Sequence, residues 1–235
     1  EGASKILNIP TGVITALGTV MLPRMSNLAA KGKTRESGQY IRQSMVFAMF
    51  LAAGMMFGIA GIAEDFVPLF LGDEYEKCVL LIRVMAPTVP FIAWANVIRT
   101  QYLIPNHEDK SYIISVVLGA AVNLAVNLSM IPAFGALGAI VGTVCAEGTV
   151  CVSQTVMVRK KLEVTRYLRD TFFYFAFGAV MFLVISILHG VISDTVVAIC
   201  VEILAGGGMY VVMSGVYTYQ RNREMLKSII RKRKF

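Results

Sequence analysis

The chain has 235 residues, of which 56% are hydrophobic and 16% charged, and its formal net charge is +7. Soluble domains usually carry about 25% charged residues, so this composition excludes an ordinary soluble domain and indicates a membrane protein. Four long runs contain no Asp, Glu, Lys or Arg: 43–63, 111–146, 171–193 and 203–220. A bilayer core of about 30 Å needs about 20 helical residues. Because lipid offers no hydrogen-bond partners to the backbone, these runs predict transmembrane helices.

The hydrophobic segments predict an all-α, polytopic transmembrane helix bundle of about seven spans. In chain order the expected spans are 5–22, 43–63, 79–103, 111–131, 134–158, 171–189 and 195–219. The chain begins almost inside the first span and has no initiator Met. We therefore expect the sequence to be the N-terminally truncated part of a longer protein.

The connecting segments alternate in charge. The segments 24–42 and 159–170 and the tail 220–235 are mainly basic, whereas 64–77 is mainly acidic. Basic loops stay on the cytoplasmic side of a membrane. This pattern predicts a multi-pass protein of the cell membrane with a cytoplasmic C-terminus. The tail is then expected to contact anionic membrane lipids, and no nucleic-acid partner is needed.

Charged and polar residues at membrane depth are candidates for function because burying them in lipid is costly. The third span carries Arg83, Asn96 and Arg99, and the fifth carries Glu147 near its middle. Either arginine could instead extend its charge to the lipid head groups. Glu147 is too deep for that, so it needs an interhelical partner or a water-filled cavity. Glu202, near the outer end of the seventh span, is expected at the interface.

Prolines and paired asparagines add local expectations. Pro87 and Pro90 should bend the third span, since each lacks an amide donor and clashes with the preceding turn. Bent helices commonly line transporter cavities. Asn123 and Asn127 lie four residues apart, and we expect them to support helix packing.

The sequence predicts neither an enzyme nor a cofactor site. It contains no GxSxG, no HExxH and no phosphate-binding loop. The four cysteines form no CxxC pair, and the two histidines lie far apart in sequence. No metal site and no disulfide framework are therefore expected.

Two stretches resemble a known family. The residues 9–26, IPTGVITALGTVMLPRMS, and 134–143, FGALGAIVGT, resemble the C-terminal half of polysaccharide flippases. These are the Wzx-like (O-antigen) members of the MOP exporter superfamily, which also contains lipid II flippases and MATE drug exporters. The resemblance implies a two-lobe, MATE-like transporter. Residues 1–158 would form the C-terminal lobe, 159–219 two additional helices, and 220–235 a basic cytoplasmic tail.

The resemblance also implies an activity and a site. The full protein would move an undecaprenyl-diphosphate-linked oligosaccharide across the membrane by alternating access, for cell-surface polysaccharide biosynthesis. Lys5 falls where lipid II flippases commonly place an arginine. The residues expected to line a substrate cavity are Lys5, Arg83, Asn96, Arg99 and Glu147. We expect at most one of the two arginines to face the substrate, and Arg99 is preferred.

The partners expected are the lipid-linked oligosaccharide, anionic lipids and the N-terminal lobe of the same protein, with polysaccharide assembly enzymes as further candidates. Two alternatives stay open. One is a MATE-like exporter of small organic cations, and the other is a non-transporting membrane scaffold of an envelope-assembly complex.

Overall fold

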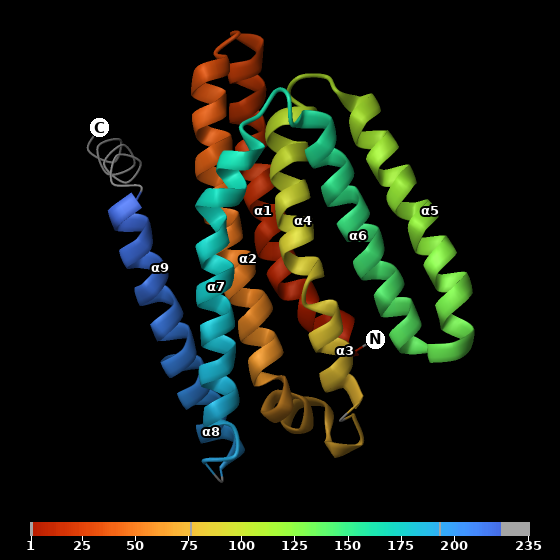
Figure 1. The fold of residues 1–235 in the computed structure, drawn as a ribbon, viewed down its shortest axis with the longest axis vertical. Coiled ribbons are helices and arrows are strands. Elements are labelled where there is room, and N and C mark those ends of the chain that lie inside the picture. Colours follow the sequence, from red (N-terminus) through yellow and green to blue (C-terminus); the bar gives the residue numbers. More distant parts are fainter. Residues whose placement is uncertain (1, 76, 193, 222–235) are drawn as a thin grey trace.

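The computed structural model describes residues 2–75, 77–192 and 194–221, with the backbone alone for 2–10 and 73. The regular elements of these residues are all helical (Figure 1). They are α1 (Gly2–Ala30), α2 (Thr34–Leu71), the short 3-10 helix η1 (Asp73–Tyr75), α3 (Lys77–Met85), α4 (Thr88–Ile98), the π-helical turn η2 (Arg99–Leu103), α5 (Asp109–Phe134), α6 (Ala136–Val158), α7 (Val164–Leu188), α8 (Thr195–Glu202), the π-helical turn η3 (Ile203–Gly207) and α9 (Gly208–Arg221).

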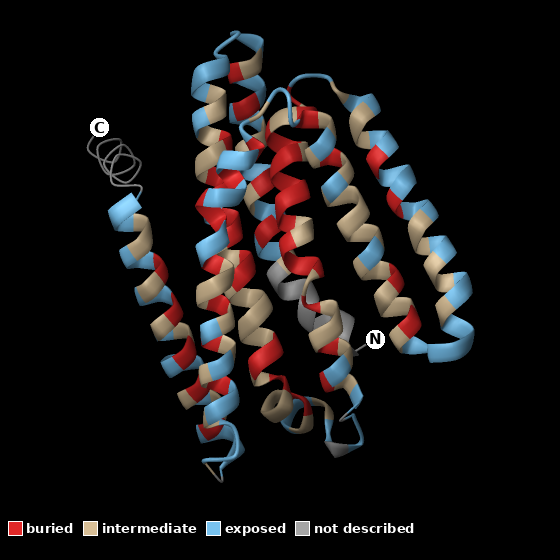
Figure 2. Ribbon diagram, in the orientation of Figure 1, coloured by how far each residue is buried: buried red, intermediate tan, exposed pale blue. Residues whose placement is uncertain are grey.

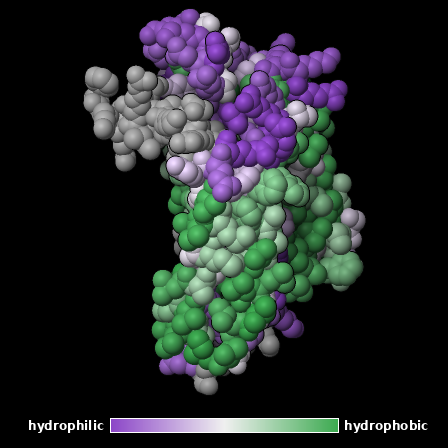
Figure 3. Space-filling model, turned by 60° about the vertical axis from the view of Figure 1, so that its left-hand side comes forward, coloured by the Kyte–Doolittle hydropathy of each residue, from purple (hydrophilic) through white to green (hydrophobic). Residues whose placement is uncertain are grey.

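The helices run back and forth between two ends of the bundle (Figure 1). Within the described residues, six helical segments are long and apolar enough to cross a membrane, from Thr34–Leu71 to Thr195–Arg221. The helix α1, 29 residues long, contains the first expected span, 5–22. Figure 3 shows a broad hydrophobic surface between hydrophilic residues at the two ends. The predicted polytopic helical bundle is confirmed.

The two ends differ in charge and are named accordingly. The basic end holds the connections α1–α2, η2–α5 and α6–α7, and α9 points toward it. The acidic end holds the connections α2–α3, α5–α6 and α7–α8. This arrangement agrees with the alternation of charge along the sequence. Which end faces the cytoplasm stays a prediction, and residues 222–235 of the basic tail lie outside the described residues.

The first connection is much shorter than expected. The helix α1 continues through Pro23 to Ala30, and α2 already begins at Thr34, so the predicted loop 24–42 is largely helical. A single proline removes only one backbone donor. Gly32, with φ of 64°, makes the turn between the helices. Across this turn, the Arg24 guanidinium of α1 donates to the Tyr40 hydroxyl of α2 and lies 4.0 Å from the centre of the Tyr40 ring.

The third span is interrupted, as the two prolines predicted. The helix α3 ends at Met85 and α4 begins at Thr88. Pro87 precedes α4 and Pro90 lies in its first turn, where a missing N–H does little harm. Further along, the Ile104 amide donates to the Arg99 carbonyl at 3.0 Å, which gives the wider π-helical turn η2.

A tight hairpin joins α5 and α6. Gly135 adopts a φ of 55° between them, a conformation that favours glycine. A Cβ at Gly138 would lie 2.6 Å from the Met130 backbone, and one at Gly142 would lie 2.1 Å from the Asn127 side chain. The Asn127 amide donates to Asn123 at 2.9 Å. The second family-like stretch, 134–143, therefore encodes close helix contact, and the asparagines lie at that contact as expected.

The buried core lies mainly on α1, α2, α4 and α7, whereas α5 exposes most of its surface (Figure 2). The helix α7 packs along α2, and α9 packs against α7. At the basic end, the Arg42 guanidinium lies 2.7 Å from the Asp170 carboxylate, which is only 2% exposed. The predicted division between 1–158 and 159–219 stays a prediction.

Candidate functional site

A cavity of about 280 Å³ lies among α1, α4, η2, α5 and α6. Three of the five predicted site residues line it: Asn96, Arg99 and Glu147. They come from segments that are about fifty residues apart in sequence, and the packing of α4 on α6 brings them together. The cavity is lined by Thr15, Ile92, Ala95, Asn96, Arg99, Tyr112, Val116, Glu147, Val150 and Gln154.

Asn96 connects α1 to Arg99. Its side chain is buried, and its amide nitrogen donates to the Ile14 carbonyl at 3.0 Å. Its side-chain carbonyl accepts from Nη2 of Arg99 at 2.8 Å. The contact is close, because a Cβ at Gly18 would lie 2.5 Å from the Asn96 amide. Both polar groups of Asn96 thus form hydrogen bonds within the protein, and one of them holds the Arg99 guanidinium.

Arg99 is the cation of the cavity wall. It begins the π-helical turn η2, and its guanidinium lies 5.7 Å from the centre of the Tyr112 ring. A guanidinium has five N–H donors in a planar fork that suits carboxylates and phosphates. The single bond to Asn96 does not exhaust these donors. The geometry therefore suits an anionic group bound in the cavity.

Acceptor groups on α6 complete the wall. Glu147 is half-buried and lines the cavity together with Arg99. Gln154 is buried and follows seven residues later, two helical turns along the same face. Its amide donates to the Ser115 hydroxyl at 3.0 Å, but its carbonyl oxygen has no hydrogen-bond partner among the described residues. Buried polar atoms normally have partners, so within the part of the chain that the structure describes this oxygen is an unsatisfied acceptor in the cavity wall.

The predicted site list missed three polar lining residues, Thr15, Tyr112 and Gln154. The spacing of seven between Glu147 and Gln154 was a readable signal for the last of these. Thr15 lies in an apolar helix and Tyr112 near the start of another. Nothing in the sequence around either residue distinguishes it from an ordinary residue at the membrane interface.

Arg83 lies apart from the cavity. Its Nη1 donates to the Glu64 carboxylate at 2.8 Å and its Nε donates to the Ala60 carbonyl at 3.0 Å. Both partners of Arg83 are on α2 near the acidic end, whereas Arg99 lies near the basic end. The two arginines are sixteen residues apart, which corresponds to about 24 Å along a helix. The side chain of Lys5 lies outside the described residues.

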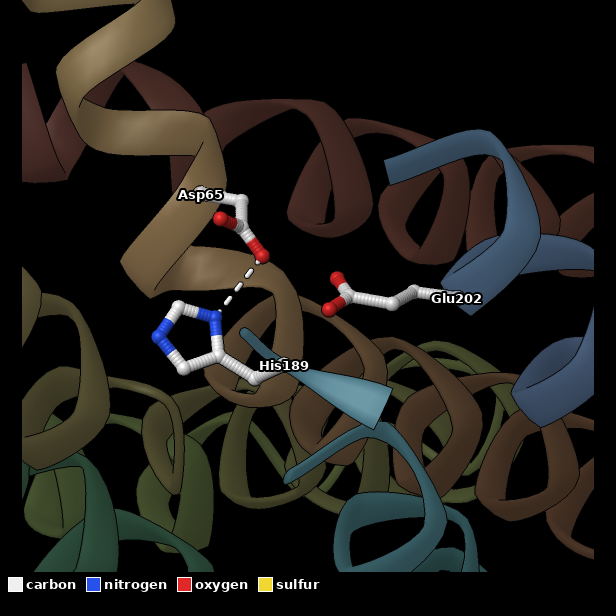
Figure 4. Close-up of side chains that lie close together, drawn as sticks. All are labelled: Asp65, His189 and Glu202. Carbon is white, nitrogen blue, oxygen red and sulfur yellow. Dashed lines mark hydrogen bonds and ion pairs between the residues drawn. The ribbon is translucent and has the colours of Figure 1, made fainter. Parts of the chain in front are cut away.

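A second polar cluster lies at the acidic end (Figure 4). Nδ1 of His189 lies 2.9 Å from Asp65, and its Nε2 lies 3.4 Å from Glu64. The hydrogen bond to Asp65 raises the pKa of His189 above its usual value. Glu202, which was expected at the membrane interface, is instead buried. Asp65, His189 and Glu202 are close enough together to hold a metal ion.

Comparison with known proteins gives one consistent family. The family described as Lipid II flippase MurJ matches residues 2–206. Lipid II flippase MurJ of Bacillus subtilis (strain 168) is 24% identical over 141 residues, which are 59% of this chain and 26% of that protein. A putative O-antigen transporter of Shigella dysenteriae is 22% identical over 147 residues, which are 63% of this chain and 36% of that protein.

The fold is similar to that of a solved transporter. Lipid II flippase MurJ in an inward closed conformation superimposes with a TM-score of 0.76 at 16% sequence identity, over 95% of this chain and 46% of that chain. At this identity the likeness concerns the fold alone. The chain spans less than half the length of each of these relatives.

Proposed function

The chain belongs to the lipid II flippase MurJ family, and we propose that it forms the C-terminal transmembrane half of a flippase for undecaprenyl-diphosphate-linked oligosaccharide precursors. It is a multi-pass membrane protein of a transporter family, not of an enzyme family. The expected exporter superfamily is confirmed. Within it, the lipid II flippases are a more specific match than the Wzx-like flippases of the initial resemblance.

The cavity around Arg99 is the observation that carries this proposal. A lipid-linked precursor presents a diphosphate, and charge-assisted hydrogen bonds from arginine offset the cost of removing that anion from water. Asn96 holds the guanidinium in place at 2.8 Å. Glu147 lines the same cavity, and its carboxylate would accept hydrogen bonds from sugar hydroxyls.

The position of the cavity fits the direction of transport. Arg99 lies near the basic end, which the loop charges predict to be cytoplasmic. Lipid-linked precursors would be loaded from that side. A second lobe of the same protein would close the opposite wall of the transport path, as the two-lobe architecture implies.

The family supports a more specific substrate within this class. We propose lipid II, because the family model that matches residues 2–206 is that of the lipid II flippases, although the two relatives are similarly distant, at 24% and 22% identity. Both kinds of substrate share the lipid diphosphate that Arg99 would bind. The sugar would be recognised largely by parts of the transport path outside Arg99.

Complementation of two strains separates these substrates. The full-length protein is expressed in a strain depleted of its lipid II flippase and, separately, in a strain lacking its O-antigen flippase. We expect growth of the first strain to be rescued. Rescue of the second strain alone would change the substrate to an O-antigen precursor. Rescue of neither strain at normal membrane levels, with no flipping of either lipid by the purified protein in vesicles, would refute the proposed activity.

A further inference from the structure

Three side chains with metal-binding atoms converge at the acidic end of the bundle (Figure 4). Asp65 comes from α2, His189 directly follows α7, and Glu202 ends α8. One possible ligand atom of each lies within 4.8 Å of the other two. The proposed flipping activity makes no use of this cluster, which lies at the end of the bundle opposite Arg99.

Glu202 shows that the cluster lacks a partner. Its side chain is 1% exposed, and neither carboxylate oxygen has a hydrogen-bond partner among the described residues. Figure 4 shows the carboxylate turned toward Asp65 and His189. An ionised carboxylate buried without a partner is strongly unfavourable. Glu202 must therefore either hold a proton or be neutralised by a positive charge between these residues.

His189 is oriented as metal-binding histidines usually are. Its Nε2 lies 3.4 Å from the Glu64 carboxylate, and Glu64 is itself held by Arg83 at 2.8 Å. Nδ1 is hydrogen-bonded to Asp65 at 2.9 Å. A bound metal ion would replace the proton on Nδ1, so that the remaining proton lies on Nε2, on the side of Glu64, and the Nδ1 lone pair faces the ion. A carboxylate that fixes the far nitrogen of a histidine is the common support of a metal ligand.

We propose that Asp65, His189 and Glu202 form a binding site for a divalent transition-metal ion, of which Zn²⁺ fits best, and that the ion fastens the α7–α8 connection to α2. One imidazole with two carboxylates suits zinc better than calcium or magnesium, which prefer oxygen ligands alone. The two carboxylates balance the double positive charge. The third carboxylate nearby, Glu64, is balanced by Arg83.

The distances require only a modest contraction. Zinc lies about 2.0–2.2 Å from its nitrogen and oxygen ligands, which places tetrahedral ligand atoms about 3.3 Å apart. The widest pair, at most 4.8 Å apart, must approach by up to about 1.5 Å, whereas Nδ1 of His189 and the Asp65 oxygen, at 2.9 Å, must separate slightly. The His189 side chain is 39% exposed, so the fourth position of the metal is open to water.

The test uses the full-length protein, purified in detergent without a polyhistidine tag and with its cysteines replaced by serine. Zinc binding is measured by calorimetry and by metal analysis after dialysis, and Co²⁺ absorption reports the coordination geometry. The variants are Glu202→Gln, which keeps the shape of the side chain, and His189→Asn. The matched control is His107→Asn, which replaces the other histidine in the sequence. Asparagine tolerates the φ of 57° at that position.

We expect one zinc ion per protein, a higher melting temperature with zinc, and a tetrahedral Co²⁺ spectrum. Glu202→Gln and His189→Asn should each weaken binding by tenfold or more, since even supporting residues contribute about 10–100-fold. His107→Asn should bind as the parent does. If zinc does not bind, or if both site variants bind it normally, the proposal is wrong. It is also wrong if Glu202→Gln raises the melting temperature while zinc has no effect on the parent, since a proton shared with Asp65 would then fill the site.

Discussion

Asn96 accepts a hydrogen bond from the Arg99 guanidinium at 2.8 Å and donates one to the Ile14 carbonyl at 3.0 Å. One buried amide thus links the cation of the candidate cavity to the backbone of α1. The orientation of Arg99 therefore depends on how closely α1 packs against α4. This dependence allows the charge and its support to be tested separately.

Removing the charge should reduce transport directly. We expect Arg99→Ala to lower flipping of lipid-linked precursor by roughly tenfold to a hundredfold, the equivalent of about 1.5–3 kcal/mol for a hydrogen bond to a charged group. Arg99→Lys should retain part of the activity, because lysine keeps the charge and loses the planar fork. Flipping is measured in vesicles and by complementation, with membrane levels checked by immunoblot. The control is Arg35→Ala, an exposed arginine at the basic end. Full activity of Arg99→Ala would contradict a role in substrate binding and would leave Arg99 as an arginine that contacts the lipid head groups.

Displacing Asn96, which holds the Arg99 guanidinium, should lower transport as the removal of Arg99 does. In Gly18→Ala the new methyl group would lie 2.5 Å from the Asn96 amide, so Asn96 must move away from Ile14 and Arg99. We expect flipping to fall while Arg99 is still present. Gly12→Ala is the matched control on the same helix, because no heavy atom lies within 4 Å of the added carbon. Equal activity of the two variants would show that Asn96 does not position Arg99.

The pair Arg42–Asp170 should contribute strongly to stability. Asp170 is 2% exposed, and its carboxylate lies 2.7 Å from Arg42 and 3.9 Å from Arg221. Removing one partner of a buried ion pair leaves the other charge uncompensated, so Arg42→Ala should cost about 3 kcal/mol. The exposed pair Arg166–Glu163 should contribute less than about 1 kcal/mol. Melting temperatures in detergent should therefore fall much further for Arg42→Ala than for Arg166→Ala.

A double-mutant cycle checks that the effect belongs to the pair. The double variant Arg42→Ala, Asp170→Ala should be less destabilised than the sum of the two single variants, because the second change removes the charge that the first left unpaired. Additive losses would mean that the two residues act independently.

Thiol labelling tests the membrane orientation. Single cysteines are placed at Ser37, at the basic end, and at Glu74, at the acidic end, in a background without the four native cysteines. Because basic loops remain cytoplasmic, an impermeant reagent should label position 74 in intact cells and position 37 only after permeabilisation. Labelling in the opposite order would invert the proposed topology and the assignment of the loading side.

The sequence predicted the helical bundle well because long uncharged runs leave few alternatives in lipid. It placed the interruption of the third span correctly, since Pro87 and Pro90 act through local chemistry. It ended the first helix too early at residue 22, because the helix continues through Pro23 and the packing of Arg24 on Tyr40 involves a residue sixteen positions away.

The sites were less predictable than the helices. Asn96, Arg99 and Glu147 stood out as polar groups at membrane depth, and they line one cavity. The contacts of these residues could not be predicted from the sequence, because they join distant segments: the hydrogen bond from Asn96 to Ile14 spans 82 positions. Likewise, Asp65 and His189 are 124 positions apart, and no sequence spacing indicates that they meet.

The interruption between Met85 and Thr88 leaves one membrane-crossing segment with two separate anchors. On one side of it Arg83 is bonded to Glu64 and Ala60 of α2. On the other side Asn96 ties α4 to α1. Since Pro87 and Pro90 provide no amide hydrogens, changing the angle between α3 and α4 breaks fewer backbone bonds than bending a continuous helix would. The part of the segment toward the acidic end can therefore tilt with α2 while Arg99 keeps its place. In the proposed flippase, this would separate movement at one end of the bundle from the hold on substrate at the other.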